Sequence, residues 1–391
     1  MTPGARIAAA IEILDEIGGG APAEKALTIW ARRSRFAGSK DRAAIRDHVF
    51  DALRCRRSFA ALGGGEDGRR LMIGALRAAG ASVDEFFSGE GHAPAPLAQV
   101  EATAGRKPNP GAEAGDIPDW LWPEFCDSLG DDTETEAEAL RHRAPVHLRV
   151  NLRKADVPNA KSALHEDGVE TRPHPACSTA LEVIAGARRI NGSRAYRDGL
   201  VELQDAASQA VVAALPLAPG MRVLDFCAGG GGKTLALAAV DGVEVFAHDA
   251  NAARMKDLPE RAARAGVDVT YIHGSELCAA DRFDVVLIDV PCSGSGSWRR
   301  APAGKWLLSP ERLADLVETQ AAILHETSQF VAPDGLLAYA TCSMLNVENG
   351  NQIRGFLEDL NWSLLLERAW HVSRGTDGFY TAHLTRNAHP D

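Results

Sequence analysis

The chain has 391 residues, enough for two or three domains of ordinary size. Its net charge of −11 argues, taken alone, against a nucleic-acid partner, because phosphate binding favours basic surfaces. No apolar run approaches the ~18–20 residues that a membrane helix needs, so we expect no membrane partner. The seven cysteines are scattered and include no CxxC pair, which predicts neither a disulfide framework nor a metal site and is typical of the cytoplasm.

Residues 1–105 are predicted to form a helical domain, since their apolar residues recur at helical spacing. Acidic residues interrupt the first apolar stretch, which therefore indicates an amphipathic helix and not a signal peptide. Residues 31–57 hold nine Lys/Arg against three Asp, so a local basic face is available despite the overall charge. A solvated helical surface is the alternative for this stretch.

Residues 101–118 are rich in Pro, Gly and Ala and are predicted to be a linker. Beyond them, residues 119–205 are predicted to form a small α+β subdomain. Residues 146–152 alternate as a strand does, a short helix follows that ends at Gly168, and two more short strands come next.

Residues 206–391 are predicted to form an α/β domain. Five short apolar runs, among them "VLDF", "VVLIDV" and "LLAYAT", alternate with helical stretches, which indicates a parallel sheet covered on both faces. One helix has a clear start, with Ser309 as N-cap and Pro310 in its first turn. Ligands of such sheets bind beyond the C-terminal ends of the strands.

The first of these strands runs into a glycine loop, "FCAGGGGKT". A phosphate-binding P-loop ending at Lys233 needs glycine at position 227, where Cys227 stands, so the P-loop interpretation is disfavoured. A Rossmann-like cofactor loop is the other interpretation. Asp249, 24 residues after Asp225, then ends the second strand and could accept hydrogen bonds from a ribose diol of NAD or S-adenosylmethionine. For Asp249 the alternative is an acid at a helix N-terminus.

Two cysteines, Cys292 and Cys342, follow two strands of the predicted sheet. A buried structural cysteine is the usual explanation for one such residue, but two at neighbouring strand ends indicate chemistry. Methylation at C5 of a pyrimidine needs a thiolate that adds to C6, because C5 is otherwise a poor nucleophile. A second group must later take the C5 proton, and nearby positive charge, such as Lys233 or a sulfonium, must favour the thiolate. These residues alone do not show which cysteine is the nucleophile.

The sequence resembles the Sun/Fmu family of RNA (cytosine-5) methyltransferases over residues 119–386. The segments that carry the resemblance are "HLRVN", "LQDAASQ", "VLDFCAGGGGKT", "DVVLIDVPCSGSG", "RRAPAGKW", "YATCSMLNVENG" and "DGFYTAHLTR". It implies an α/β, Rossmann-like methyltransferase domain that uses S-adenosyl-L-methionine, with ribosomal RNA as the expected substrate. Transfer RNA, or a non-catalytic RNA-binding assembly role on the same scaffold, are the alternatives; an NAD-dependent enzyme would leave both cysteines unexplained.

The resemblance also implies roles for individual residues. Cys342 would be the nucleophile and Cys292 would help to release the product, while Asp289 would lie near cytosine N3 and the cofactor, and Lys233 matches the motif lysine. The implied cofactor-binding residues are Cys227, Ala228, Gly229, Gly230, Gly231, Gly232, Lys233, Asp249 and Asp289.

The chain departs from the family pattern at Gly230, where proline is usual, and at Gly274-Ser275, where Gly-Asp is usual. The helical region is similar to a NusB-like RNA-binding domain, mainly through "GSKDRAAIRDHVFDALR". If so, the basic stretch would bind RNA backbone. Further expected RNA contacts are Arg149, Asn151, Arg299, Arg300 and Lys305, with ordinary strand polarity as the alternative for the first two.

Overall fold

The computed structural model describes residues 1–387, except for the side chain of Ser275. The chain divides into two compact units: Met1–Arg143 with Trp298–Leu308, and Ala144–Ser297 with Ser309–Asp391. Among the described residues, no helix combines the length and apolarity needed to cross a membrane. The division into domains 1–105, 119–205 and 206–391 stays a prediction.

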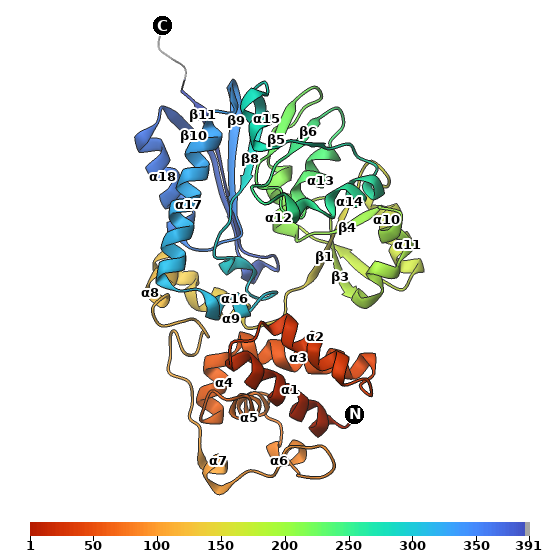
Figure 1. Ribbon diagram of the computed structural model, residues 1–391, viewed down its shortest axis with the longest axis vertical. Helices are drawn as coiled ribbons and strands as arrows, with labels where there is room; N and C mark the ends of the chain where they lie inside the picture. The colour runs from red at the N-terminus through yellow and green to blue at the C-terminus, as the bar shows by residue number, and fades with distance from the viewer. Residues whose placement is uncertain (388–391) are drawn as a thin grey trace. The chain divides into compact units, whose positions relative to one another are not determined.

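The first unit is helical, as predicted (Figure 1). Its α-helices are α1 (Pro3–Gly18), α2 (Ala23–Arg33), α3 (Ser39–Arg54), α4 (Arg56–Gly63), α5 (Gly68–Ala78), α6 (Val83–Phe86), α7 (Gln99–Thr103), α8 (Trp122–Leu129), α9 (Thr133–Leu140) and α16 (Ala303–Leu307). The apolar faces of helices α1 to α5 pack into one hydrophobic core, which includes Ile13, Ile45 and Ile73. Helices α4 and α5 pack so closely that a Cβ on Gly74 would lie 1.9 Å from the carbonyl oxygen of Phe59.

The predicted linker 101–118 contains part of α7 and packs against the helices. Asp116 is fully buried, and its carboxylate accepts hydrogen bonds of 2.9 Å from the backbone N–H groups of Arg57 and Ser58. Its other oxygen lies 2.9 Å from Nε of Arg141. A run rich in Pro, Gly and Ala can therefore be ordered when a buried acid ties it to neighbouring helices.

The second unit begins with a four-stranded antiparallel sheet in the order β2-β3-β1-β4. The elements are β1 (Val146–Val150), α10 (Val157–Glu166), β2 (Glu170–Pro173), β3 (Ala180–Ala185), α11 (Arg194–Arg197) and β4 (Val201–Leu203). The predicted strands and helix are confirmed, and Gly168 lies just beyond α10 with a φ of 72°. Asp156 caps α10 by accepting the N–H of Asn159.

A seven-stranded sheet in the order β10-β11-β9-β8-β5-β6-β7 forms the rest of this unit. Its strands are β5 (Arg222–Asp225), β6 (Glu244–Ala247), β7 (Thr270–Tyr271), β8 (Phe283–Asp289), β9 (Val331–Thr341), β10 (Trp362–Trp370) and β11 (Phe379–Arg386). The five predicted runs form β5 to β9, which are parallel. The predicted parallel sheet is confirmed for these five strands, and β10 and β11 add an antiparallel edge that was not predicted.

Helices cover both faces of this sheet (Figure 1). They are α12 (Ala206–Ala213), α13 (Gly232–Ala238), α14 (Leu258–Ala265), α15 (Gly274–Ala279), α17 (Pro310–Ser328) and α18 (Gly350–Asp359). Alternate residues of a strand face opposite sides, so Val285 joins the core under α12 and α13, and Val286 joins that under α17 and α18. Ser309 caps α17 as predicted, accepting the N–H of Arg312.

Candidate active site

The polar residues predicted for the site lie where the parallel strands end. Asp225 and Asp289 are the last residues of β5 and β8, and Cys342 directly follows β9. Because neighbouring parallel strands end at one edge of the sheet, these residues and the loops that follow them share that edge. Register pairs Asp289 with Ala340, two residues before Cys342.

The glycine loop turns sharply between β5 and α13. Gly229 and Gly231 have φ values of 52° and 81°, in the left-handed region that favours glycine. A Cβ on Gly231 would lie 2.2 Å from Cδ1 of Leu258, whereas a Cβ on Gly230 would come no nearer than 3.6 Å to Arg261. The departure at Gly230 therefore sits at a position that has room for a side chain.

Asp249 is held against this loop. Its Oδ2 accepts the N–H of Gly229 at 2.9 Å, its Oδ1 accepts the N–H of Asn251 at 2.9 Å, and the guanidinium of Arg254 lies 3.4 Å away. A carboxylate has about four acceptor positions, so it can still accept bonds from a ligand diol. The structure thus brings the loop and the acid together, and their role in cofactor binding stays a prediction.

Lys233 and Asp289 form a close ion pair, 2.7 Å between Nζ and Oδ2. Lys233 is buried, and its ammonium also lies 4.8 Å from the ring centre of Phe379. Burial by itself would lower the pKa of Lys233, but the carboxylate of Asp289, with smaller effects of Cys342 and Asp225, raises it. A fixed positive charge therefore lies close to the thiol of Cys342.

The two cysteines lie 3.4 Å apart, Sγ to Sγ, and both are partly exposed. A hydrogen bond to Cys342 and burial raise the pKa of the Cys292 thiol well above its ordinary value. The protonated form of Cys292 is therefore favoured, and a hydrogen bond joins the two sulfur atoms. The backbone N–H of Gly296 also donates to the carbonyl of Cys342 at 3.0 Å, which ties the two loops together.

Glu348, which the sequence reasoning missed, lies fully buried beneath both cysteine loops. Its carboxylate accepts the backbone N–H of Ser293 at 2.7 Å, the side-chain amide of Gln320 at 3.0 Å and the hydroxyl of Ser343. Each serine follows a site cysteine directly. The acid in "NVENG" could have been noticed as a charged residue beside the second cysteine motif, but its partners could not.

The hydrogen bonds of Asp225 show whether the residues of this edge suit the expected cofactor. Its Oδ2 accepts the hydroxyl of Thr234 at 2.6 Å, whereas its buried Oδ1 has no partner within residues 1–387. Burial raises the pKa of Asp225 to about 7. An unsatisfied acceptor beneath a glycine loop, beside Asp249, fits a ligand rich in hydrogen-bond donors, so these residues suit S-adenosylmethionine.

Cys227 and Ala228 line the same turn, and burial raises the pKa of the Cys227 thiol. The Gly230 carbonyl accepts a hydrogen bond from Arg261, and Gly232 begins α13. The departure at Gly274-Ser275 lies where α15 begins, and the side chain of Ser275 is outside the described part. The structure thus brings together every residue predicted for the loop.

Four expected RNA contacts are corrected, because their side chains are buried. Asn151 donates to the carbonyl groups of Gly199 and Ala265, and Arg149 donates to that of Gly232 at 3.2 Å. Burial lowers the pKa of Arg149 to about 10. These residues hold the small sheet against the large one instead of meeting solvent.

The other two corrections concern the segment after the first cysteine motif. Arg299 and Lys305 are 5% and 1% exposed, and Nζ of Lys305 donates to the carbonyl of Arg54 at 3.0 Å. Burial lowers the pKa of Lys305 to about 8. The segment is a packing element of the helical unit, and only Arg300 of the three expected contacts is exposed.

Comparisons with known proteins agree with this arrangement. The family model described as "16S rRNA methyltransferase RsmB/F" matches residues 212–387, and that of an RsmF/B-like ferredoxin-like domain matches residues 117–211. Ribosomal RNA small subunit methyltransferase B of Citrobacter koseri is 33% identical over 247 residues, 62% of this chain and 58% of that protein. The protein of the same name from Salmonella arizonae is 33% identical over 286 residues, 69% of this chain and 66% of its own length.

The chain thus spans 58–66% of the length of these curated relatives. The crystal structure of PH0851 has the same fold over 99% of each chain, with a TM-score of 0.77 and 24% identity. The predicted resemblance to the Sun/Fmu family is confirmed for the two matched regions, whereas the NusB-like character of the helical region stays a prediction. Through residues 117–387, the chain belongs to the RsmB/F family of S-adenosylmethionine-dependent methyltransferases.

Proposed function

We propose that the protein methylates C5 of a cytosine in small-subunit ribosomal RNA, through a covalent bond between Cys342 and C6. The observation that carries this proposal is the pair of thiols 3.4 Å apart, beside the Lys233–Asp289 ion pair, at the edge of a methyltransferase sheet. Relatives named as ribosomal RNA small subunit methyltransferase B support the choice of RNA.

Cys342 is the nucleophile in this proposal. Its sulfur is hydrogen-bonded to that of Cys292 and has the ammonium of Lys233 nearby, and positive charge near a thiolate stabilises it. Addition of the thiolate to C6 gives an enamine, and the electron pair becomes available at C5. S-adenosylmethionine, when bound, supplies the methyl group. A cytosine within a duplex has to leave its stack before it can reach Cys342.

Asp289 and Lys233 act as a unit on the pyrimidine ring. Asp289 is 32% exposed in its side chain, so it can face the ring while one oxygen holds Lys233. A proton taken from solvent and held between the second oxygen of Asp289 and N3 would let the ring accept the charge that the thiolate brings. Lys233, which is buried, keeps the carboxyl in place and compensates the negative charge.

Cys292 takes part in release. Its pKa is raised by hydrogen bonding and charge from Cys342, and this charge disappears once the sulfur of Cys342 is bonded to carbon. Cys292 can then give up its proton to solvent and, as a thiolate, accept the proton from C5. Loss of that proton restores the ring double bond and expels Cys342.

The helical unit is the proposed RNA-binding part, in line with its NusB-like sequence, and we propose domains at 1–105, 119–205 and 206–391. Helices α2 and α3 enclose a hollow of about 560 Å³ whose lining includes Arg32, Arg35, Arg42 and Arg46. Arg46 already binds Glu24 through two nitrogens, so the other three guanidinium groups form the local basic surface that suits an RNA backbone.

Mass spectrometry of nucleosides tests the proposed function. Purified protein, S-adenosylmethionine and unmodified small-subunit ribosomal RNA should yield 5-methylcytidine, and protein with Cys342→Ala should yield none. Methylation at another atom of cytosine, or at another base, would contradict the proposal. Transfer RNA in place of ribosomal RNA tests the substrate class in the same assay.

A further inference from the structure

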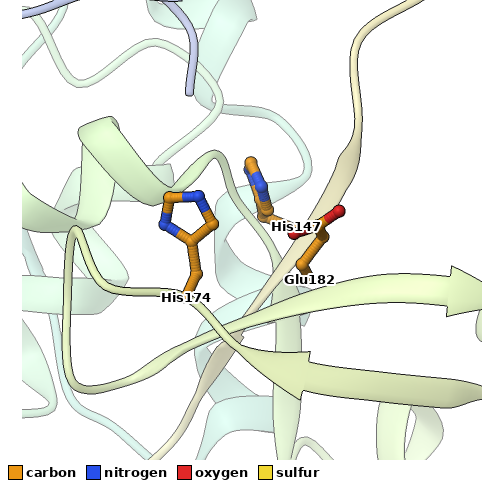
Figure 2. Close-up of side chains that lie close together, drawn as sticks. All are labelled: His147, His174 and Glu182. Carbon is orange, nitrogen blue, oxygen red and sulfur yellow. The ribbon is translucent and has the colours of Figure 1, made fainter. Parts of the chain in front are cut away.

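Two histidines and a glutamate gather on the small sheet, in a part of the unit that the proposed reaction does not use. His147 lies on β1, His174 follows β2, and Glu182 lies on β3. One nitrogen or oxygen atom from each lies within 4.8 Å of the others. Figure 2 shows the two imidazoles side by side, with the carboxylate of Glu182 beside His147. Both histidines are buried, and their ring centres are 4.8 Å apart.

His147 has the arrangement of a metal-binding histidine. Its Nδ1 lies 2.9 Å from Oδ2 of Asp205 and 3.3 Å from the N–H of Ala206. A carboxylate only accepts, so the shorter contact places a proton on Nδ1, and in the neutral imidazole Nε2 then carries a lone pair. That Nε2 is buried without a hydrogen-bond partner among the described residues. A buried acceptor left unsatisfied is costly, and a carboxylate behind an imidazole is the usual support of a metal ligand.

Glu182 and His174 can complete the site. Glu182 binds Arg172 through both oxygens, at 2.9 and 3.0 Å, yet a carboxylate keeps further lone pairs for a cation. His174 accepts a weak hydrogen bond of 3.2 Å from the N–H of Ala176 at Nδ1. Metal binding by His174 would break this hydrogen bond. Nδ1 would then either bind the metal itself or carry the proton that a metal displaces from Nε2.

We propose that His147, His174 and Glu182 bind one zinc ion, with water in the fourth position. Two imidazole nitrogens and one carboxylate oxygen suit zinc, whereas calcium and magnesium prefer oxygen ligands only. Zinc–nitrogen bonds of about 2.0–2.1 Å require tetrahedral ligand atoms to lie about 3.4 Å apart. The present spread of up to 4.8 Å would therefore have to decrease by about 1.4 Å on binding, through rotation of the ligand side chains.

The role of this ion would be to stabilise the junction between the two sheets. Oδ1 of Asp205, which stands behind His147, accepts the N–H groups of Ala207 at 2.9 Å and Asp377 at 3.1 Å. Ala207 lies in the first turn of α12, and Asp377 precedes β11, whose Phe379 covers Lys233. A metal on His147 would therefore fix a carboxylate that holds both elements of the large sheet.

Cobalt titration of the full-length protein tests the proposal. After treatment with a chelator, Co²⁺ should bind in one equivalent, with the visible absorption of a tetrahedral nitrogen and oxygen site, and Zn²⁺ should displace it. His174→Ala and Glu182→Gln should each weaken binding at least tenfold, with circular dichroism showing that the variants are folded. His165→Ala, an exposed histidine on the same subdomain, is the matched control and should bind as the unchanged protein does.

Zn²⁺ should also raise the melting temperature of the chelated protein and of His165→Ala, but not that of His174→Ala. No stoichiometric binding, or equal binding by His174→Ala, would overturn the proposal. So would the near-ultraviolet band of thiolate coordination, because the ion would then sit on Cys292 and Cys342. Methyl transfer is not part of this test, so its result is separate from the fate of the proposed function.

Discussion

Cys292 and Cys342 lie fifty positions apart in the chain, yet their sulfur atoms are 3.4 Å apart. The loops that carry them follow β8 and β9, which are adjacent and parallel, so both loops leave the sheet at the same edge. At this separation one sulfur can hold a proton while the other carries a charge. The roles proposed for the two cysteines depend on this asymmetry.

Glu348→Gln should lower kcat about tenfold or more while the affinity for S-adenosylhomocysteine stays unchanged. Glutamine presents an N–H₂ group to a place where Glu348 accepts from Ser293, Gln320 and Ser343. One buried donor facing another costs on the order of 1–3 kcal/mol and displaces the two cysteine loops. Single-turnover methylation and calorimetry provide the two readouts.

Glu358→Gln, on the exposed face of α18, is the control for that variant and should retain normal kcat. If Glu348→Gln lost affinity for the cofactor product in proportion to its loss of kcat, Glu348 would support the whole site and not the cysteine loops in particular.

Gly231→Ala should weaken S-adenosylhomocysteine binding at least tenfold. The new Cβ would lie 2.2 Å from Leu258, at a φ of 81° that alanine adopts only with strain. Gly230→Ala is the matched control, because its Cβ meets only Arg261 at 3.6 Å. Calorimetric titration compares the two. Equal losses would show that any side chain in the loop blocks binding, and that the backbone of Gly231 is not the cause.

In Asp225→Asn, the free energy of unfolding should decrease less with rising pH than it does in the unchanged protein. The folded pKa of about 7 lies above the ordinary value of 3.8, so the folded protein holds a proton that the unfolded chain has released. The contribution of Asp225 to the free energy of unfolding is fully present below about pH 4. It is lost as the pH rises to about 7, and the loss is at most about 4 kcal/mol.

Melting temperatures at pH 5 and pH 8 measure this effect. The decrease should be smaller in Asp225→Asn than in the unchanged protein, and unaltered in Asp241→Asn, whose side chain is 99% exposed. A steeper decrease in Asp225→Asn would mean that the carboxyl is ionised in the folded protein.

Arg35→Ala with Arg42→Ala should weaken RNA binding and lower the slope of log Kd against log salt concentration by about 0.7–0.9 for each lost phosphate contact. Both residues line the hollow between α2 and α3. Arg33→Ala is the control, because this nearby arginine already pairs with Glu12 and Glu16. Filter binding over a range of salt concentrations gives both quantities, and an unchanged slope would place the RNA elsewhere.

Local patterns in the sequence were enough to predict the framework of the site. Strand-like runs ending at Asp225, Asp289 and Cys342 indicated which residues would share the edge of a parallel sheet, because that edge follows from chain direction alone. The N-cap Ser309 and Pro310 likewise marked the start of α17 from two adjacent residues.

Features that depend on contacts between distant residues could not be predicted in this way. Glu348 became visible only when β8 and β9 brought Ser293 to it, across 55 positions. Lys305 follows a cysteine motif and resembles an RNA contact, but it is buried against a carbonyl 251 positions away. The segment between the antiparallel strands β10 and β11 does contain a turn signal, Asp377-Gly378, but the sequence reasoning did not use it.

The most direct test of the central claim uses Cys292→Ala with substrate RNA and S-adenosylmethionine on a denaturing gel. Addition by Cys342 should proceed while release stalls, so a covalent protein–RNA band should accumulate, and it should be absent from the double variant Cys292→Ala/Cys342→Ala. Cys278→Ala, which changes an exposed cysteine, should turn over normally without such a band. Normal turnover by Cys292→Ala, or an adduct that persists without Cys342, would contradict the proposed roles of the two sulfur atoms.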